Sequence, residues 1–207
     1  MNADPRRVEN SIMRLALQAT EATIGQSGVN AVLRVAGLER LLAQPPANDD
    51  RLTTAGSDYA ALFAGMFSMY GEHSARGVFR RWGANFGKLG VNSRPTAKLL
   101  RPMLNLLPMT RRTHTLLEAL AREADRARGE GLHTLGEDDY AYTLTFADCL
   151  YCSDLRSAEP ICLTIVGTIE AVLTWGTGRD FSVTETTCQA RGDEVCTFVI
   201  DKRPLNV

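Results

Sequence analysis

Four side chains that can bind a metal ion lie in the last quarter of the chain, and they constrain the fold more than any other feature. They are Cys162, Glu185, Cys188 and Cys196. An apolar, helix-like run that ends in glycines separates the first from the other three, which lie around two strand-like runs joined by a Gly-Asp turn. A helix packed on a hairpin could therefore bring all four together. The pattern alone leaves open a bound metal, a set of disulfides or a coincidence.

The N-terminal part of the chain carries helical periodicity. Apolar residues recur at intervals of three and four, as in amphipathic helices that bury one side. Helices are predicted over about residues 7–24, 29–43, 58–70, 78–86, 99–107 and 110–128. Breaks are expected at Gly25, Gly28 and Gly71, and a turn over residues 87–95, because glycine and proline interrupt helices.

After residue 131 the pattern becomes that of strands. Tyr142, Leu144 and Phe146 alternate with other residues, which places them on one face of a strand. Strands are predicted over about residues 132–135, 140–146, 181–188 and 195–201, with a helix starting at Pro160 and ending near Trp175. Helices followed by strands around one helix predict an α+β fold, with an antiparallel sheet packed with helices.

The charge balance argues against several classes of partner. The 23 basic and 24 acidic residues are mixed along the chain and give a net charge of -1, so no direct nucleic-acid binding is expected. No apolar run approaches the ~20 residues of a membrane-spanning helix, and the start lacks the apolar region of a signal peptide. We therefore expect a cytoplasmic protein, in which cysteines are metal ligands, redox groups or buried thiols before they are disulfides.

Zinc is the metal that the four side chains would suit. It favours tetrahedral sites with thiolate ligands, and it accepts a glutamate oxygen. Glu185 and Cys188 are three residues apart at the end of one predicted strand, and the following turn can return Cys196 to them. Cys162 would come from the start of the preceding helix, where the helix dipole favours a thiolate. The competing interpretation is three buried thiols and a surface carboxylate.

The same segment carries a specific pattern of residues. They are Pro160, Cys162, Gly167, Gly178, the run from Glu185 to Cys188, Gly192, Asp193, Cys196 and Phe198. This pattern resembles the 4-vinyl-reductase-like domain family, also described as hydrocarbon-binding domains, over about the last 60 residues. The family includes sensory domains of phenol- and toluene-responsive activators and bacteriochlorophyll vinyl-reductase-like proteins.

The resemblance implies a structural zinc cofactor, a fold and a cavity. In the phenol sensors, zinc is held by three cysteines and a glutamate at the spacing of Cys162, Glu185, Cys188 and Cys196. The implied fold is similar to that of vesicle-tethering TRAPP subunits, with a cavity for aromatic or tetrapyrrole-like molecules. We accordingly divide the chain into an N-terminal helical extension, residues 1–50, and a ligand-binding domain, residues 51–207.

Cys149 and Cys152 form a C-x-x-C pair in the loop before the predicted helix. A redox role would need a thiolate at a helix N-terminus in a thioredoxin-like βαβ unit, and the surrounding pattern differs from that. The pair is either an alternative metal ligand set together with Cys162 or two reduced loop thiols. Loop thiols are the simpler interpretation.

Aromatic and methionine side chains could line a ligand site between the helices and the sheet, because such sites are mostly apolar. The candidates are Phe63, Phe67, Tyr70, Trp82, Phe86, Met103, His114 and Tyr142. His114 enters by resemblance, since the phenol sensors use a histidine and a tryptophan upstream of the first zinc cysteine. The corresponding strand here carries Ala141 and Tyr142 in place of the tryptophan. The alternative for each candidate is a place in the ordinary core.

We expect a sensor or carrier for a small hydrophobic or aromatic ligand, with a tetrapyrrole among the ligands that the resemblance implies. The N-terminal helices are expected to form a homodimer surface, because an amphipathic extension needs something to cover it. Two alternatives remain: an enzyme or carrier acting on a vinyl tetrapyrrole in bacteriochlorophyll synthesis, and a structural interaction subunit without ligand. An enzyme has thin support, because the three histidines fall in no triad and no dinucleotide motif is present.

Overall fold

The computed structural model describes residues 5–129 and 131–205. The start of the predicted helical extension, residues 1–4, and the end of the predicted ligand-binding domain, residues 206–207, lie outside the described residues. The elements are β1 (Arg7–Val8), α1 (Asn10–Val35), α2 (Arg40–Ala43), β2 (Thr54–Ala55), α3 (Gly56–Ser93), α4 (Pro95–Leu104), α5 (Met109–Arg128), β3 (His133–Glu137), β4 (Ala141–Phe146), α6 (Leu163–Thr177), β5 (Phe181–Thr187), a 3-10 turn (Gln189–Arg191) and β6 (Cys196–Pro204).

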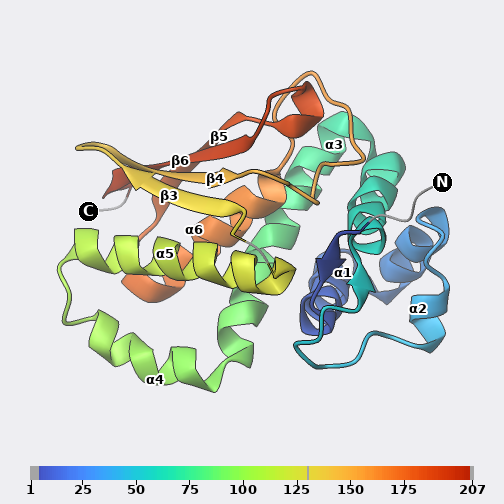
Figure 1. Ribbon diagram of the computed structural model, residues 1–207, viewed down its shortest axis with the longest axis horizontal. Coiled ribbons are helices and arrows are strands. Elements are labelled where there is room, and N and C mark those ends of the chain that lie inside the picture. Colours follow the sequence, from blue (N-terminus) through green and yellow to red (C-terminus); the bar gives the residue numbers. More distant parts are fainter. Residues whose placement is uncertain (1–4, 130, 206–207) are drawn as a thin grey trace.

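The predicted α+β fold with an antiparallel sheet packed with helices is confirmed. Four strands pair in the order β3-β4-β6-β5, and every pairing is antiparallel. Helices α5 and α6 lie beneath this sheet, with α3 and α1 beyond them (Figure 1). Strands β1 and β2 form a separate two-stranded ribbon near the start of α1.

Strand β4 shows why the sheet has one buried face. Tyr142, Leu144 and Phe146 alternate as predicted, and all three are buried. In the register with β6, Leu144 lies opposite Phe198 and Phe146 lies opposite Cys196. The apolar alternation of β4 therefore fixes the point at which Cys196 enters the core.

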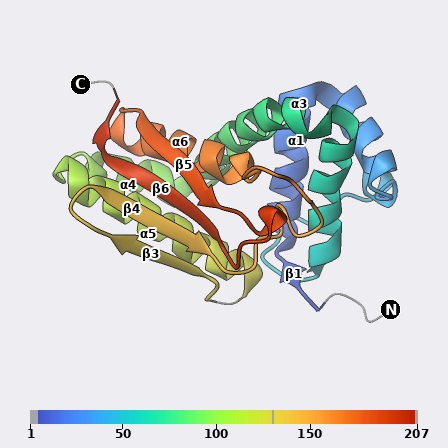
Figure 2. The ribbon, with the colours of Figure 1, turned by 90° about the horizontal axis from the view of Figure 1, so that it is seen from above.

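Helix α6 packs against α3, α5 and β5. It crosses α3 (Figure 2), and at the crossing the backbones of the two helices lie close together. A Cβ atom added to Gly83 of α3 would lie 1.9 Å from the carbonyl oxygen of Thr164. A Cβ atom added to Gly167 of α6 would lie 2.0 Å from the carbonyl oxygen of Arg80. The two helices cross where each has a glycine, because only glycine leaves room for the other backbone.

Two of the predicted glycine breaks are confirmed. Gly25 in α1 and Gly71 in α3 have positive φ angles of 73° and 68°, and each interrupts the helix around it. Gly28 stays helical. The predicted turn over residues 87–95 is wrong, because α3 continues to Ser93. A Cβ atom on Gly87 would lie 3.0 Å from the carbonyl oxygen of Thr168, so this glycine serves close packing against α6 rather than a turn.

Helix α1 buries its apolar side within the chain. Met13, Ala16 and Ala19 are inaccessible to solvent, and α1 packs against α3. The amphipathic pattern that suggested a dimer surface is therefore already covered, while the homodimer and the boundary at residue 50 stay predictions. Within residues 5–129 and 131–205, no helix has the length and apolarity that crossing a membrane requires.

Candidate functional site

The N-terminal end of α6 presents Cys162 to the hairpin. The helix begins at Leu163, after Cys162, rather than at Pro160 as predicted. The backbone N–H of Cys162 donates to Glu185 Oε2 at 2.7 Å. This contact joins the start of the helix to the inner face of β5, because strand alternation turns the Glu185 side chain toward the core.

The β5–β6 connection brings the other two predicted ligands to the same place. Cys188 follows β5, and its N–H donates to Asp193 Oδ2 at 2.8 Å. Gly192 has a φ of 101°, which allows the chain to reverse just before Asp193. Cys196 then opens β6, and its Sγ accepts a hydrogen bond from the N–H of Gln189 at 3.3 Å.

The four predicted ligands meet at metal-binding distances. Their ligand atoms all lie within 4.8 Å of one another. The Sγ atom of Cys162 is 3.8 Å from both that of Cys188 and that of Cys196. A tetrahedral ion with Zn–S bonds of about 2.3 Å separates its sulfur ligands by ~3.8 Å. Cys162, Glu185, Cys188 and Cys196 therefore form a site that could hold a metal ion.

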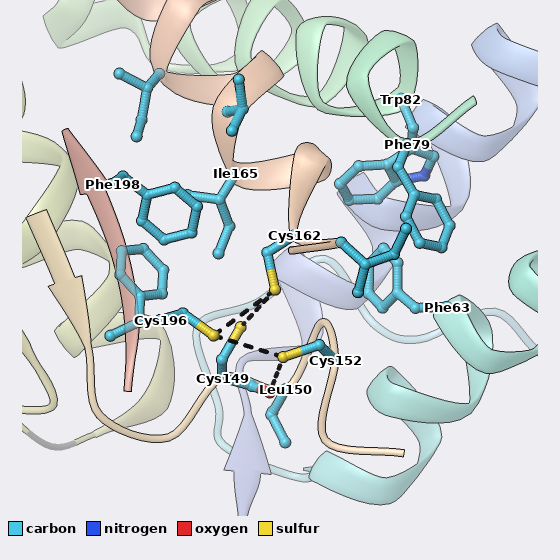
Figure 3. Packing of buried hydrophobic residues seen from close by; sticks show 14 of the residues in the cluster. Phe63, Phe79, Trp82, Cys149, Leu150, Cys152, Cys162, Ile165, Cys196 and Phe198 are labelled. Atoms are coloured by element: carbon cyan, nitrogen blue, oxygen red, sulfur yellow. Dashed lines mark hydrogen bonds between the residues drawn. The ribbon is translucent and has the colours of Figure 1, made fainter. Parts of the chain in front are cut away.

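Cys149 and Cys152 belong to the same cluster (Figure 3). The Sγ atoms of Cys149 and Cys162 are 3.5 Å apart, as are those of Cys152 and Cys196. Both residues are free thiols in the loop before α6, and both are only 1% exposed. The two predicted alternatives, reduced loop thiols and a metal ligand set with Cys162, both stay predictions. Cys149, Cys152, Cys162 and Cys196 form a second group that could hold a metal ion. All five cysteines are free thiols rather than disulfides.

Burial and crowding set the protonation of these groups. Burial raises the pKa of Cys162 well above its usual value and also raises that of Cys149. Hydrogen bonds from neighbouring thiols, that of Cys152 first, hold the pKa of Cys188 far below its usual value. Burial, followed by the nearby Cys188 sulfur, raises the pKa of Glu185 to about 9. A divalent ion bound here would favour deprotonation of the cysteines and of Glu185, because metal ligands bind in their deprotonated forms.

A large cavity lies between helices α1, α3, α4, α5 and α6. Its volume is about 800 Å³. Its apolar lining comprises Ile12, Leu15, Phe86, Val91, Ala97, Met103, Leu104, Leu107, Leu116, Ala119, Leu120, Val172 and Trp175. Its charged lining is Arg14, Asp50, Arg94 and Glu123, of which Arg94 and Glu123 form an ion pair.

A smaller cavity of about 120 Å³ adjoins the large one and shares Ile12, Phe86 and Leu120 with it. Cys149 and Tyr151 also line this smaller cavity. It therefore extends from the large cavity toward the cysteine cluster.

Two of the eight predicted ligand residues line the large cavity, namely Phe86 and Met103. Phe63 and Trp82 are fully buried in an aromatic core cluster, where their ring centroids are 5.0 Å apart. Phe67 and Tyr70 pack against the core from partly buried positions.

The last two candidates meet under the sheet. The ring of His114 lies 6.1 Å from that of Tyr142, whose hydroxyl donates to the carbonyl oxygen of Thr110 at 2.8 Å. Sequence reasoning missed the cavity residues of α1 and α6, such as Leu15, Val172 and Trp175. Their helical periodicity marked a buried side without showing that part of it faces a void.

Comparison with known proteins confirms the predicted domain resemblance. Residues 143–202 match the family model of the 4-vinyl reductase domain (the V-4-R domain). This span contains all four predicted metal ligands and both additional cysteines. The match covers less than a third of the chain. No curated protein matches the chain.

Solved structures of similar fold include H-NOX proteins. The Fe(II) unliganded H-NOX protein from K. algicida has a TM-score of 0.58 and 10% identity over 96% of this chain and 98% of its own. The H-NOX protein from S. oneidensis in the Fe(II)NO ligation state has a TM-score of 0.56 and 12% identity over 96% of this chain and 99% of its own. A structure from work on heme distortion in the H-NOX family has a TM-score of 0.57 and 13% identity over 96% of this chain and 97% of its own. At these identities the likeness concerns the fold alone.

Proposed function

We propose that this protein is a sensor or carrier domain that binds a small hydrophobic ligand, stabilised by a structural zinc ion. The observation that carries the proposal is the cavity of about 800 Å³. Pockets for small molecules commonly span ~300–1,000 Å³ and are lined by apolar and aromatic side chains with few polar groups. Most of the residues that line this cavity are apolar, with aromatic rings from Phe86 and Trp175, and the uncharged polar lining is Ser11, Gln18, Asn48, Ser93, Thr115 and Thr168.

The lining of the cavity favours a ligand with aromatic or other apolar groups. Phe86 and Trp175 approach from different helices and offer ring faces or edges for aromatic contacts. Of the charged lining residues, Arg94 and Glu123 form an ion pair with each other, and Asp50 lies 3.6 Å from Arg126. Arg14 donates to the carbonyl oxygen of Pro46 and keeps its charge at the cavity. Burial of apolar surface would supply most of the binding free energy.

The fold neighbours raise the question of heme, since one of them comes from work on heme distortion. Heme iron in proteins is held by histidine, cysteine, methionine or tyrosine side chains. Among the described residues that line the large cavity, Met103 is the single member of these types, and it is 63% exposed. The large cavity alone therefore offers no buried iron ligand, whereas the smaller cavity that adjoins it carries His133, Cys149 and Tyr151. The proposal is confined to a ligand that needs no iron contact.

The proposed zinc ligands are Cys162, Glu185, Cys188 and Cys196. Supporting this assignment are the Sγ–Sγ distances of 3.8 Å, the complete burial of the sulfurs and the match to the 4-vinyl reductase domain. Zinc there would tie the start of α6 to the β5–β6 hairpin, which is a structural role. Protein purified without added metal should contain zinc, and a folded, zinc-free protein would contradict this part.

Thermal unfolding with chemical probes tests the ligand part. Naphthalene and biphenyl should raise the melting temperature of the wild type, since a ligand at a hundredfold excess over Kd adds about 2.7 kcal/mol of stability. In Val172→Trp, an indole occupies part of the cavity from α6, and the shift should become smaller. Leu42→Trp, at a 39% exposed position on α2, is the matched control and should keep the shift.

The same experiment separates the alternatives. Metal-free protoporphyrin, or a co-purified pigment with Soret-type absorption, would support the vinyl-tetrapyrrole alternative if it shifts the melting temperature in place of the small aromatics. If no probe of either class shifts the wild type and native mass spectrometry finds no co-purified molecule, the ligand-binding proposal is wrong and the interaction-subunit alternative gains.

A further inference from the structure

Cys149 and Cys152 have no role in the proposed zinc site, yet they are part of its inner wall. Their loop, between β4 and α6, is held in place because the N–H of Cys149 donates to Gln189 Oε1 at 2.8 Å. Gln189 in turn belongs to the β5–β6 connection. Figure 3 shows the sulfurs of Cys149 and Cys152 turned toward those of Cys162 and Cys196.

These six potential ligands form two overlapping groups of four. One set comprises Cys149, Cys152, Cys162 and Cys196, and the other comprises Cys162, Glu185, Cys188 and Cys196. Within each set the ligand atoms lie within 4.8 Å of one another. The two sets share Cys162 and Cys196, whose Sγ atoms are 3.8 Å apart.

We propose that this cluster binds two divalent, thiophilic metal ions, with the Sγ atoms of Cys162 and Cys196 bridging them. The inference rests on the zinc site proposed above and adds a second ion to it. Each ion would have two bridging sulfurs and two terminal ligands, which completes two tetrahedra that share an edge. The terminal ligands would be Cys149 and Cys152 on one ion, and Glu185 and Cys188 on the other.

The distances fit this division. An edge of a tetrahedral zinc–thiolate site is ~3.8 Å long, given Zn–S bonds of about 2.3 Å. Each bridging sulfur has a terminal sulfur of the added set at 3.5 Å, Cys149 beside Cys162 and Cys152 beside Cys196. A disulfide would need about 2.05 Å, so none of these pairs is one. Iron–sulfur clusters place inorganic sulfide between their cysteines, and sulfurs this close leave no room for it.

A buried orphan oxygen points to a cation independently of the sulfurs. Glu185 is 8% exposed, and its Oε1 is buried without a hydrogen-bond partner, while Oε2 accepts the N–H of Cys162. A buried polar atom without a partner costs free energy, and a metal ion would satisfy it.

Charge balance is the same for two ions as for one, so a second ion adds no net buried charge. Five thiolates and one carboxylate carry six negative charges, and two divalent ions offset four of them. The start of α6 and the N–H of Gln189, 3.3 Å from Cys196 Sγ, offset part of the remainder. A single ion on three thiolates and Glu185 would leave the same two negative charges, with Cys149 and Cys152 as neutral thiols beside Cys162 and Cys196.

Metal stoichiometry of the full chain tests the proposal. Native mass spectrometry and elemental analysis of wild type, purified with reductant and without chelator, should give two zinc ions per chain. The double variant Cys149→Ser/Cys152→Ser should hold one. Cadmium-113 NMR of the wild type exchanged into cadmium should give two resonances, one for a four-sulfur site and one for a site with three sulfurs and an oxygen. This readout needs no variant, so it holds even if the double variant fails to fold.

The outcomes separate this inference from the proposed function. One zinc in both proteins, with one cadmium resonance, would overturn the second ion and leave the zinc site of Cys162, Glu185, Cys188 and Cys196 in place. A folded wild type without zinc would overturn both. The melting-temperature shift with aromatic probes depends on the cavity, so it reports on ligand binding whatever the metal count.

Discussion

The two ends of helix α6 differ in how they are filled. At its N-terminal end, five cysteines and Glu185 are packed so closely that sulfurs touch at 3.5–3.8 Å. Further along, Thr168, Val172 and Trp175 of the same helix face a void of about 800 Å³. At the first end, side chains that could bind a metal ion fill the space. At the second end, no described side chain fills the space beside the helix.

The end of α6 near the cysteines is held rigidly, whereas the end beside the cavity has room to adapt to a ligand. The crossing of α3 and α6 at Gly83 and Gly167 lies between the two ends and fixes the helix that both share. A ligand site can be hollow only if the elements around it are held elsewhere, since a void forgoes packing contacts. The cysteine cluster and the glycine crossing are therefore expected to carry stability that the cavity end lacks.

The largest expected effect comes from removing the residue shared by both metal sets. Cys162→Ser should lower the free energy of unfolding by about 4 kcal/mol or more, because losing a metal centre is among the most destabilising single changes. Urea unfolding of metal-loaded protein measures this. Cys149→Ser, which leaves Glu185 and Cys188 with both bridging residues, should cost less. Equal costs would contradict the special position of Cys162.

The glycine crossing should come second. Gly83→Ala is expected to destabilise the fold by roughly 3 kcal/mol, because its Cβ would lie 1.9 Å from the carbonyl oxygen of Thr164, and backbone must move. Gly77→Ala is the matched control in the same helix. Nothing lies within 4 Å of its Cβ, so better helix propensity should make it neutral or stabilising by up to about 1 kcal/mol. Similar melting temperatures for the two variants would refute the close crossing.

Two leucines on α5 allow the stability cost of a Leu→Ala change to be compared between the packed core and the cavity wall. Leu117 is fully buried in the core, and Leu117→Ala should cost about 3 kcal/mol. Leu120 lines both cavities and already lacks neighbours on one side, so Leu120→Ala should cost only ~1 kcal/mol. Chemical denaturation of both variants without ligand measures the difference. A cost for Leu120 as large as that for Leu117 would mean that the cavity is closed in solution.

The smallest effect concerns His133 at the start of β3. Burial lowers its pKa below the usual value of about 6.5, although Asp125 Oδ1 lies 2.7 Å from its Nδ1. The folded state thus binds protons more weakly than the unfolded state. Stability from the neutral ring is complete above the unfolded pKa and is lost as pH falls below about 6.5 toward the folded pKa.

The difference between wild type and His133→Gln isolates this contribution, because acid also releases metal from both proteins. The unfolding midpoint of wild type relative to the variant should fall between about pH 7.5 and about pH 5.5, the range that brackets the unfolded pKa. His73→Gln, an exposed histidine, should track the wild type across this range. A relative midpoint that rises on acidification would show that Asp125 outweighs burial and raises the pKa.

Much of the site near β5 and β6 could be predicted from sequence. The spacing of Glu185, Cys188 and Cys196 around a Gly-Asp turn requires a hairpin, and a hairpin brings its two ends together. Cys149 and Cys152 were assigned to a loop correctly, but a loop has no periodicity that shows which way it faces. Their burial depends on Gln189, forty residues away from Cys149, so local pattern could not show it.

The residues that line the cavity were harder to predict from sequence, because helical periodicity does not show the space that a buried face borders. Aromatic side chains mark a buried face, and Phe63 and Trp82 are indeed buried, but they pack against one another. The cavity is bounded by leucines and Trp175 from helices far apart in sequence, where three and four residue spacing shows only that a side faces inward. The sequence cannot say whether the space beyond that face is filled.

The amino-acid sequence alone was enough to predict the α+β class, the alternation of β4 and the hairpin that carries Glu185, Cys188 and Cys196, because these follow from local periodicity and short turns. Only the tertiary structure decided that all five cysteines share one cluster, that residues 87–93 continue a helix and that α6 borders a void. Each of these depends on contacts between elements distant in the chain, where packing and close backbone approach override local propensity.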